Sequence, residues 1–160
     1  MRILGIDPGI GRTGWGVIRH EKGNIHVGNY GCIETFQTSS LEKRLATLYT
    51  KIGDIITTEK PDSLAIEELF FNTNVSTALI VGQARGVILL AAAQANLSIG
   101  VYTPLQVKMA VSGYGRAGKG QVGQMIKTLL KLSEIPKPDD TADALAIAIT
   151  HAFSYKMNKV

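Results

Sequence analysis

The sequence predicts an α/β fold in which helices flank a mixed sheet of five strands. Short apolar runs alternate with longer segments of helical period, and the first three short runs follow one another without a helix between them. A hairpin-linked start followed by alternating strands and helices implies a mixed sheet covered by helices. The 160 residues and the 45% hydrophobic content suit one domain, spanning residues 1–160.

The first part of the chain is predicted to form a meander of strands and then a long helix. Strands are expected at residues 2–7, 14–20 and 25–34. Apolar residues then keep a helical period from residue 41 to residue 60, and Pro61 ends that helix. Ser39 and Glu42 stand in the spacing of a capping box at its start.

The second part of the chain alternates strands with helices. Strands are expected at residues 63–67 and 98–103, and helices at residues 75–96, after Pro104, at about 119–132 and at about 141–156. The most apolar stretch, residues 78–97, contains Gln83, Arg85 and Gln94. These polar side chains argue against a membrane span, so a buried or interface helix is expected there.

The charge balance favours a polyanionic partner. Lys and Arg total 17 against 13 Asp and Glu, which gives a net charge of +4. If several acids share one metal site, the remaining surface is more basic than this sum. The single cysteine, Cys32, excludes an intrachain disulfide, and the N-terminus passes directly into Asp7-Pro8-Gly9 without a secretory signal. We therefore expect a cytoplasmic protein without a membrane partner.

The glycines after the first strand match a dinucleotide-binding fingerprint in spacing alone. Gly9, Gly11 and Gly14 spell GxGxxG. That fingerprint must open a helix, whereas residues 15–18 are strand-like. These glycines are therefore expected to shape a hairpin.

A second glycine-rich segment, residues 113–120, matches most of a phosphate-binding loop. Gly120 stands where the Walker A pattern requires the Ser or Thr that binds magnesium, so ATP binding is not expected. The segment is either a flexible loop or a mobile basic arm that brings Arg116 and Lys119 to a phosphate chain. Its charge pattern favours the arm.

Four carboxylates stand at the ends of predicted buried elements. Asp7 and Glu67 each end a strand, and Asp140 and Asp143 open the last helix. Each has a structural explanation as a turn residue, a charge that guards a sheet edge, or a first-turn acid. Together they favour a common site, because neighbouring parallel strands end at the same edge and two acids three positions apart share a helix face.

Such a group of acids predicts metal-dependent phosphate chemistry. Four oxygen-donor side chains would hold two Mg²⁺ ions about 3.5–4 Å apart, with Mn²⁺ as a substitute, in the arrangement that serves phosphodiester hydrolysis. Glu68 is expected to point to the opposite face of its strand from Glu67. Glu68 and Asp139 are therefore expected to take no part.

The motifs of this chain resemble, in order and over nearly its whole length, those of the RuvC family of Holliday-junction resolvases. This family consists of dimeric nucleases of the RNase H-like superfamily. The motifs are Gly5-Ile6-Asp7-Pro8-Gly9, Ala65-Ile66-Glu67, Gly82-Gln83-Ala84-Arg85-Gly86, Gln106-Val107-Lys108, Lys119, and the run from Ala142 through Asp143 to His151.

The resemblance implies an RNase H-like fold and an endonuclease that resolves four-way DNA junctions by paired symmetric nicks in recombination and repair. It implies that the four acids bind the metals and that the nicks leave 5′-phosphate and 3′-hydroxyl ends. Lys108 and Lys119 would serve the scissile phosphate or the junction backbone. Phe70 would stack on opened bases, although the adjacent Phe71 leaves two candidate rings. The resemblance also implies a homodimer that works with the branch-migration proteins RuvA and RuvB.

Two other classes of protein share part of this pattern. An actin-like or sugar-kinase-like phosphotransferase shares the acid and glycines after its first strand, but it needs a second lobe and another phosphate loop. A non-catalytic junction-binding protein is disfavoured because the set of acids is complete.

The helix at residues 75–96 is the predicted dimer surface. Gly82 and Gly86 would permit close approach of a partner. The apolar residues that offer this surface are Val81, Val87, Ile88, Leu90 and Ala91, and burial in the core is the alternative for any one of them. His151, on the apolar last helix, is expected to be a packed core histidine.

Overall fold

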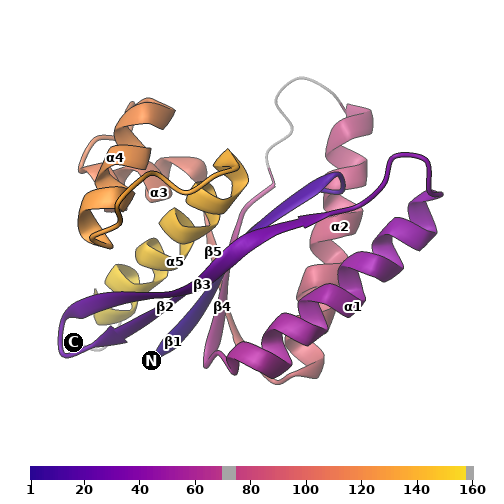
Figure 1. Ribbon diagram of the computed structural model, residues 1–160, viewed down its shortest axis with the longest axis horizontal. Coiled ribbons are helices and arrows are strands. Elements are labelled where there is room, and N and C mark those ends of the chain that lie inside the picture. Colours follow the sequence, from indigo (N-terminus) through magenta and orange to yellow (C-terminus); the bar gives the residue numbers. More distant parts are fainter. Residues whose placement is uncertain (70–74, 158–160) are drawn as a thin grey trace.

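The computed structural model describes residues 1–69 and 75–157 and contains a five-stranded mixed sheet in the order β3-β2-β1-β4-β5 (Figure 1). The central strand β1 pairs antiparallel with β2 and parallel with β4. The predicted meander and mixed sheet are therefore confirmed. The strands are β1 (Arg2–Asp7), β2 (Arg12–Glu21), β3 (Asn24–Glu34), β4 (Ser63–Glu67) and β5 (Ser98–Tyr102).

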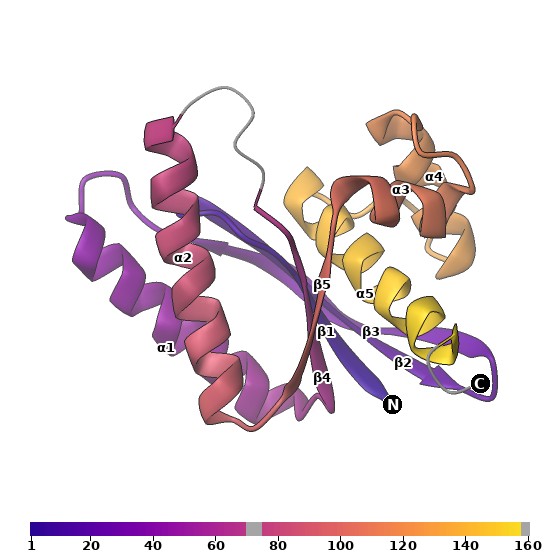
Figure 2. The ribbon, with the colours of Figure 1, turned by 180° about the vertical axis from the view of Figure 1, so that it is seen from behind.

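Helices cover both faces of the sheet. Two helices lie on one face and three on the other, and α5 runs across the middle strands (Figures 1 and 2). The first face carries α1 (Leu41–Glu59) and α2 (Val75–Gln94), and the second carries α3 (Pro104–Ser112), α4 (Lys119–Leu129) and α5 (Asp139–Met157). Each interface between helices and sheet is a separate hydrophobic core.

Alternation along the strands decides which core each residue enters. In β1, Leu4 and Ile6 pack in the core under α1 and α2, whereas Ile3 packs in the core under α5. The same alternation puts Leu64 and Ile66 of β4 on the first face and leaves Ala65 for the second. The residues that end these two strands, Asp7 and Glu67, therefore share the face covered by α5.

The first turns of α5 lie directly on the strands because glycine removes the side chains that would keep them apart. A Cβ atom on Gly5 would lie 2.1 Å from the carbonyl oxygen of Ala144, and one on Gly14 would lie 1.8 Å from that of Asp140. Gly14 thus serves helix packing, and β2 continues as a strand through it. The dinucleotide fingerprint is excluded, as predicted.

The capping box predicted for α1 is wrong. The helix begins at Leu41 with Ser40 as its N-cap, and no side chain caps it. The hydroxyl of Ser40 instead donates to the carboxylate of Glu42, which now stands at the second helical position. The sequence therefore predicted the N-cap one position too early, at Ser39 instead of Ser40.

The apolar helix α2 is only partly covered within the protomer. By length and composition alone it could cross a membrane, a test that core helices of other proteins also pass. Ile88 and Ala91 are buried in the core, so their predicted place on a dimer surface is wrong. They face the sheet because they stand four and seven positions after the buried Ala84, on one side of the helix. The exposed large apolar side chains of α2 are Val75, Leu79 and Leu90.

Candidate active site

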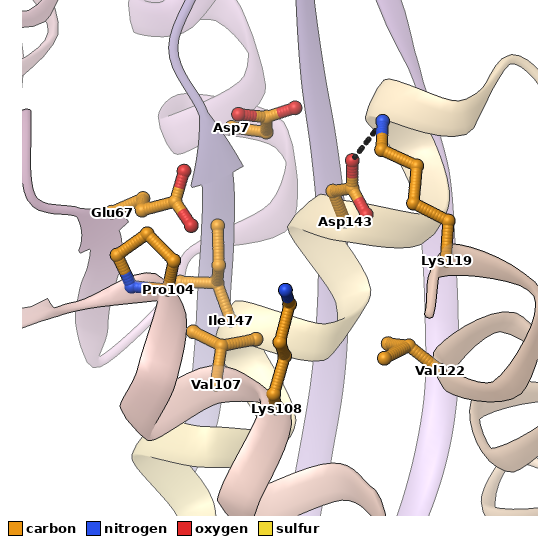
Figure 3. A pocket seen from close by; sticks show the side chains of 9 residues that line it. All are labelled: Asp7, Glu67, Pro104, Val107, Lys108, Lys119, Val122, Asp143 and Ile147. Carbon is orange, nitrogen blue, oxygen red and sulfur yellow. Dashed lines mark ion pairs between the residues drawn. The ribbon is translucent and has the colours of Figure 1, made fainter. Parts of the chain in front are cut away.

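A pocket of about 370 Å³ lies where the carboxyl ends of β1 and β4 meet α5 (Figure 3). The structure brings five of the predicted site residues together in its lining: Asp7, Glu67, Lys108, Lys119 and Asp143. Apolar side chains complete the lining: Pro104, Val107, Val122 and Ile147. Acids and cations from five elements therefore surround one small volume.

The backbone explains why the two strand-end acids meet. Ile6 and Ile66 are paired in the parallel ladder, so Asp7 and Glu67 follow it one step further along neighbouring strands. Both side chains point to the face of α5 by the alternation of the strands. Glu68, the next residue, is exposed and absent from the pocket lining, in agreement with the expectation that it takes no part.

The third acid of the pocket is held by a lysine. Asp143 projects from the second turn of α5, and Lys119 begins α4. The Nζ atom of Lys119 lies 3.6 Å from Oδ2 of Asp143, and Figure 3 shows this pair at the rim of the pocket. The negative charge of Asp143 raises the pKa of Lys119. Lys119 therefore stays charged beside the acids.

Burial and mutual repulsion make these acids hard to ionise together. Burial, followed by the charges of Asp143, Glu67 and Asp140, raises the pKa of Asp7 to about 8, and Lys119 opposes this rise. Burial is also the first cause of the raised pKa values of Glu67 and Asp143. A bound divalent cation would favour the ionised form of all of them.

The donor set of the pocket fits a hard metal ion. Its carboxylate oxygens are the ligand type that Mg²⁺ and Mn²⁺ prefer. Within residues 1–69 and 75–157, however, no group of three His, Cys, Asp or Glu side chains is already arranged around one point. Asp143 is engaged by Lys119 rather than turned toward Asp7 (Figure 3).

Asp140 lies apart from the other three acids. It does not line the pocket, and its Oδ2 atom lies 3.6 Å from Nε of Arg12, which opens β2. It remains close enough for its charge to raise the pKa of Asp7. Asp139 lines a neighbouring hollow that it shares with Lys119 and Asp143. Asp139, Asp140 and Asp143 all lie near the start of α5. Of these three acids, Asp143 is the one that lines the pocket at the carboxyl ends of β1 and β4.

The glycine-rich segment is a short connection between α3 and α4. Gly113 ends α3 with a φ of 72°, and Ala117 is buried with its N–H bonded to the carbonyl of Tyr114 at 3.0 Å. Only Lys119, where α4 begins, lines the pocket, and Arg116 is exposed outside that lining. In the structure the segment is a turn anchored at Ala117, and the mobile basic arm favoured from sequence stays a prediction.

Four further residues bear on the site. Phe70 and Phe71 lie outside the described residues. His151 is buried, with its Nδ1 atom 2.8 Å from the hydroxyl of Tyr102, as expected for a core histidine. Arg85 of α2 was not singled out from sequence as a site residue. Its Nε donates to the carbonyl oxygen of Glu67 at 3.2 Å and so helps to place the end of β4.

Metal binding to this pocket is expected to strengthen as pH rises toward about 8. A proton on Asp7 competes with the metal for the same oxygens, so affinity falls as Asp7 becomes protonated below its pKa. Titration of Mn²⁺ followed by electron paramagnetic resonance, between about pH 6 and pH 9, measures this. Asp7→Asn should flatten the profile, and Asp54→Asn on the exposed side of α1 should not. A flat profile for the unmodified protein would contradict the assignment of Asp7.

Acids at the carboxyl edge of a mixed sheet, with lysines beside them and α5 laid across the strands, define an RNase H-like nuclease fold. Comparison of the sequence with known families agrees with this class of nuclease and identifies one family within it. The family of crossover junction endodeoxyribonuclease RuvC matches residues 3–151. The chain therefore belongs to the RuvC family.

Individual relatives and solved structures agree over nearly the full length. RuvC of Alkaliphilus oremlandii is 58% identical over 152 residues, which cover 95% of this chain and 93% of that protein. RuvC of Caldicellulosiruptor saccharolyticus is 56% identical over 155 residues, covering 96% and 93% respectively. The structure of Thermus thermophilus RuvC in complex with a Holliday junction substrate superposes with a TM-score of 0.94 at 35% identity, covering 99% of this chain and 96% of that one.

Proposed function

We propose that this chain resolves four-way DNA junctions during recombination and repair by hydrolysing one phosphodiester bond in each of two strands. The observation that carries the proposal is the convergence of Asp7, Glu67 and Asp143 with Lys119 on one pocket. The pocket lies in a fold shared with a protein solved in complex with a Holliday junction substrate. The products would be ligatable 5′-phosphate and 3′-hydroxyl ends.

The acids would hold two divalent metal ions, with Mg²⁺ as the first choice and Mn²⁺ as a substitute. Asp7, Glu67 and Asp143 would supply ligands from the pocket, and Asp140 from its rim once Arg12 releases it. When bound, such ions activate the attacking water and stabilise the leaving oxygen. The apolar side chains of Val107, Val122 and Ile147 limit the water around these carboxylates.

The cations of the site would position the DNA. Lys108 and Lys119 line the pocket and would contact the scissile phosphate or the junction backbone. Arg116 is exposed on the turn that precedes α4 and would contact the backbone further out. Phe70 and Phe71 follow the end of β4 in sequence and would provide a ring that stacks on opened bases.

Incubating the protein with an end-labelled synthetic four-way junction and Mg²⁺ tests the proposal. Paired nicks at symmetric positions, with the linear duplex of the same sequence left intact, are the expected result. Tight junction binding without any nick would favour a non-catalytic binding protein. Release of phosphate from a nucleotide without cleavage of DNA would favour a phosphotransferase.

We further propose that the working form is a homodimer in the cytoplasm, assisted by RuvA and RuvB. One active site cuts one strand at a time, so symmetric resolution needs two sites related by a two-fold axis. Leu79 and Leu90 of α2 are 60% and 52% exposed, and a Cβ on Gly86 would meet nothing within 4 Å. This side of α2, together with Val75, is the proposed dimer face.

Lys119→Ala is expected to slow cleavage about ten- to a hundredfold and to flatten the salt dependence of junction binding. The variant removes one cation that faces both Asp143 and the incoming phosphate. Single-turnover cleavage and binding at several salt concentrations measure the two effects. Lys127→Ala, near the end of the same helix α4, is the matched control. An unchanged salt slope for Lys119→Ala would show that this lysine makes no contact with the DNA backbone.

A further inference from the structure

The edge of the sheet that carries the acids continues into a cationic surface. Because β2 and β3 run antiparallel to their neighbours, the start of β2 and the end of β3 lie at the same edge as Asp7. Arg12 opens β2 and is paired with Glu34 in the ladder of β3. Across this edge the charges therefore change from acids on β4 and β1 to an arginine on β2.

A second arginine reaches this edge from the helix on the opposite face. Arg44 of α1 is half-buried, and its Nε donates to the hydroxyl oxygen of Thr35 at 2.9 Å. That hydroxyl in turn donates to the carbonyl of Ile10, and the N–H of Thr35 donates to the carbonyl of Gly11 at 3.0 Å. Arg44 is thus held against the turn between β1 and β2.

The guanidinium group of Arg44 has a positive charge and terminal N–H donors that are available to a ligand. No carboxylate among the described residues lies within 4 Å of it, and Thr35 engages its Nε alone. One terminal nitrogen lies 3.7 Å from the position that a Cβ on Gly11 would occupy. A pre-positioned guanidinium without an acidic partner is the usual protein ligand of a phosphate.

The surface between these side chains is concave. Arg12, Thr35 and Gln37 line an open hollow of about 430 Å³, together with Gly11 and Glu34. Its acid, Glu34, is exposed and forms no ion pair with Arg12, whose partner is Asp140. Phe36 stands between two of the lining residues and is 81% exposed. The hollow therefore offers donors, one cation on its wall and a second beside it.

We propose that Arg12 and Arg44 form a backbone-binding subsite for the DNA strand that enters the active site. The proposal rests on the proposed nuclease function, since it identifies where the strand continues beyond the pocket. Neighbouring strands lie about 4.8 Å apart, so the end of β3 is about 10 Å from β1 along the edge. The rise of about 3.4 Å per phosphate is measured along the DNA axis, and consecutive phosphates of one strand lie further apart than this, so the path has room for about one phosphate beyond the pocket.

The subsite also connects Arg12 with the acids. In the structure Arg12 is paired with Asp140, the one predicted metal ligand that lies outside the pocket. A DNA phosphate at the hollow competes with Asp140 for the guanidinium group. Binding of the strand would thereby free Asp140 for the metal site while Arg12 keeps an anionic partner.

The salt dependence of junction binding in EDTA, followed by fluorescence anisotropy, tests the subsite without relying on cleavage. Each phosphate contact contributes about 0.9 to the slope of log affinity against log salt. Arg44→Ala and Arg12→Ala should each lower the slope by about that amount, and the double variant by about twice as much. Between about 50 and 200 mM salt, one contact fewer makes the loss of affinity about 3.5-fold smaller.

Three further variants distinguish the loss of a charged contact with DNA from a loss of protein structure. Arg19→Ala is the matched control, because Arg19 stands at the other end of β2 and pairs with the exposed Glu21 at 3.5 Å. Its slope should equal that of the unmodified protein. Arg44→Lys should keep most of the slope although it loses the contact with Thr35. Glu34→Gln should strengthen binding, a direction that loss of structure would not produce.

Unchanged slopes for Arg12→Ala and Arg44→Ala, in a protein that cuts junctions normally, would overturn the subsite and leave the nuclease function standing. If the unmodified protein bound junctions but never cut them, the nuclease function would fail, and lowered slopes would still support the subsite. Weaker binding by Glu34→Gln would also contradict the proposed charge pattern.

Discussion

Asp7→Asn is expected to lower junction cleavage at least about a hundredfold while leaving junction binding in place. Asp7 ends the central strand and lies in the pocket with Glu67 and Asp143. The amide keeps the shape of the side chain but removes the charge that a metal ligand needs. Binding depends on the surrounding cations and should persist. Single-turnover cleavage and anisotropy with a labelled junction measure the two properties.

The same substitution is expected to stabilise the metal-free protein. Because the folded state raises the pKa of Asp7 from 3.8 to about 8, the folded chain keeps a proton that the unfolded chain has lost. The contribution of Asp7 to stability therefore falls as pH rises from about 4 to about 8. Asp7→Asn should raise the free energy of unfolding in EDTA near pH 8 by more than about 1 kcal/mol, as measured by urea denaturation.

Glu68→Gln is the matched control for both measurements. Glu68 lies next to Glu67 but is exposed and outside the pocket lining. It should cleave normally and show unchanged stability. Full cleavage by Asp7→Asn would remove Asp7 from the site, and a less stable Asp7→Asn would contradict the repulsion among the acids.

Leu90→Glu and Gly86→Glu are expected to produce monomers that no longer make paired nicks. Both positions belong to the apolar side of α2 that the protomer leaves uncovered. A charge there leaves the protomer fold intact but opposes burial of that face against a second copy. Mass in solution by light scattering, together with the fraction of junctions cut in both strands, checks the result.

Gln124→Glu adds the same charge at an exposed position of α4, on the other face of the sheet, and should remain dimeric. A monomeric Leu90→Glu protein that still made paired, symmetric nicks would break the proposed link between the dimer and resolution. A dimeric Leu90→Glu protein would place the interface elsewhere.

Sequence determined those features of the protein that depend on residues near one another along the chain. The short apolar run from Ile3 to Ile6 specifies β1, and the helical period of residues 41–60 specifies α1. Asp7 and Glu67 were predicted as site residues because each directly ends an apolar strand. Side-chain alternation in strands has a fixed period, so it needs no knowledge of the rest of the fold.

Only the tertiary structure decided how the elements meet. Asp140 and Asp143 look equivalent in sequence, but the contact of α5 with Gly5 and Gly14 directs Asp143 into the pocket and leaves Asp140 to Arg12. The rotation of a helix about its own axis is set by its packing on the sheet, because only that contact distinguishes one polar side from another. Arg44 could not be predicted from sequence for the same reason. Its contact with Thr35 depends on how α1 is oriented relative to the end of β3, and the order of elements along the chain does not determine that orientation.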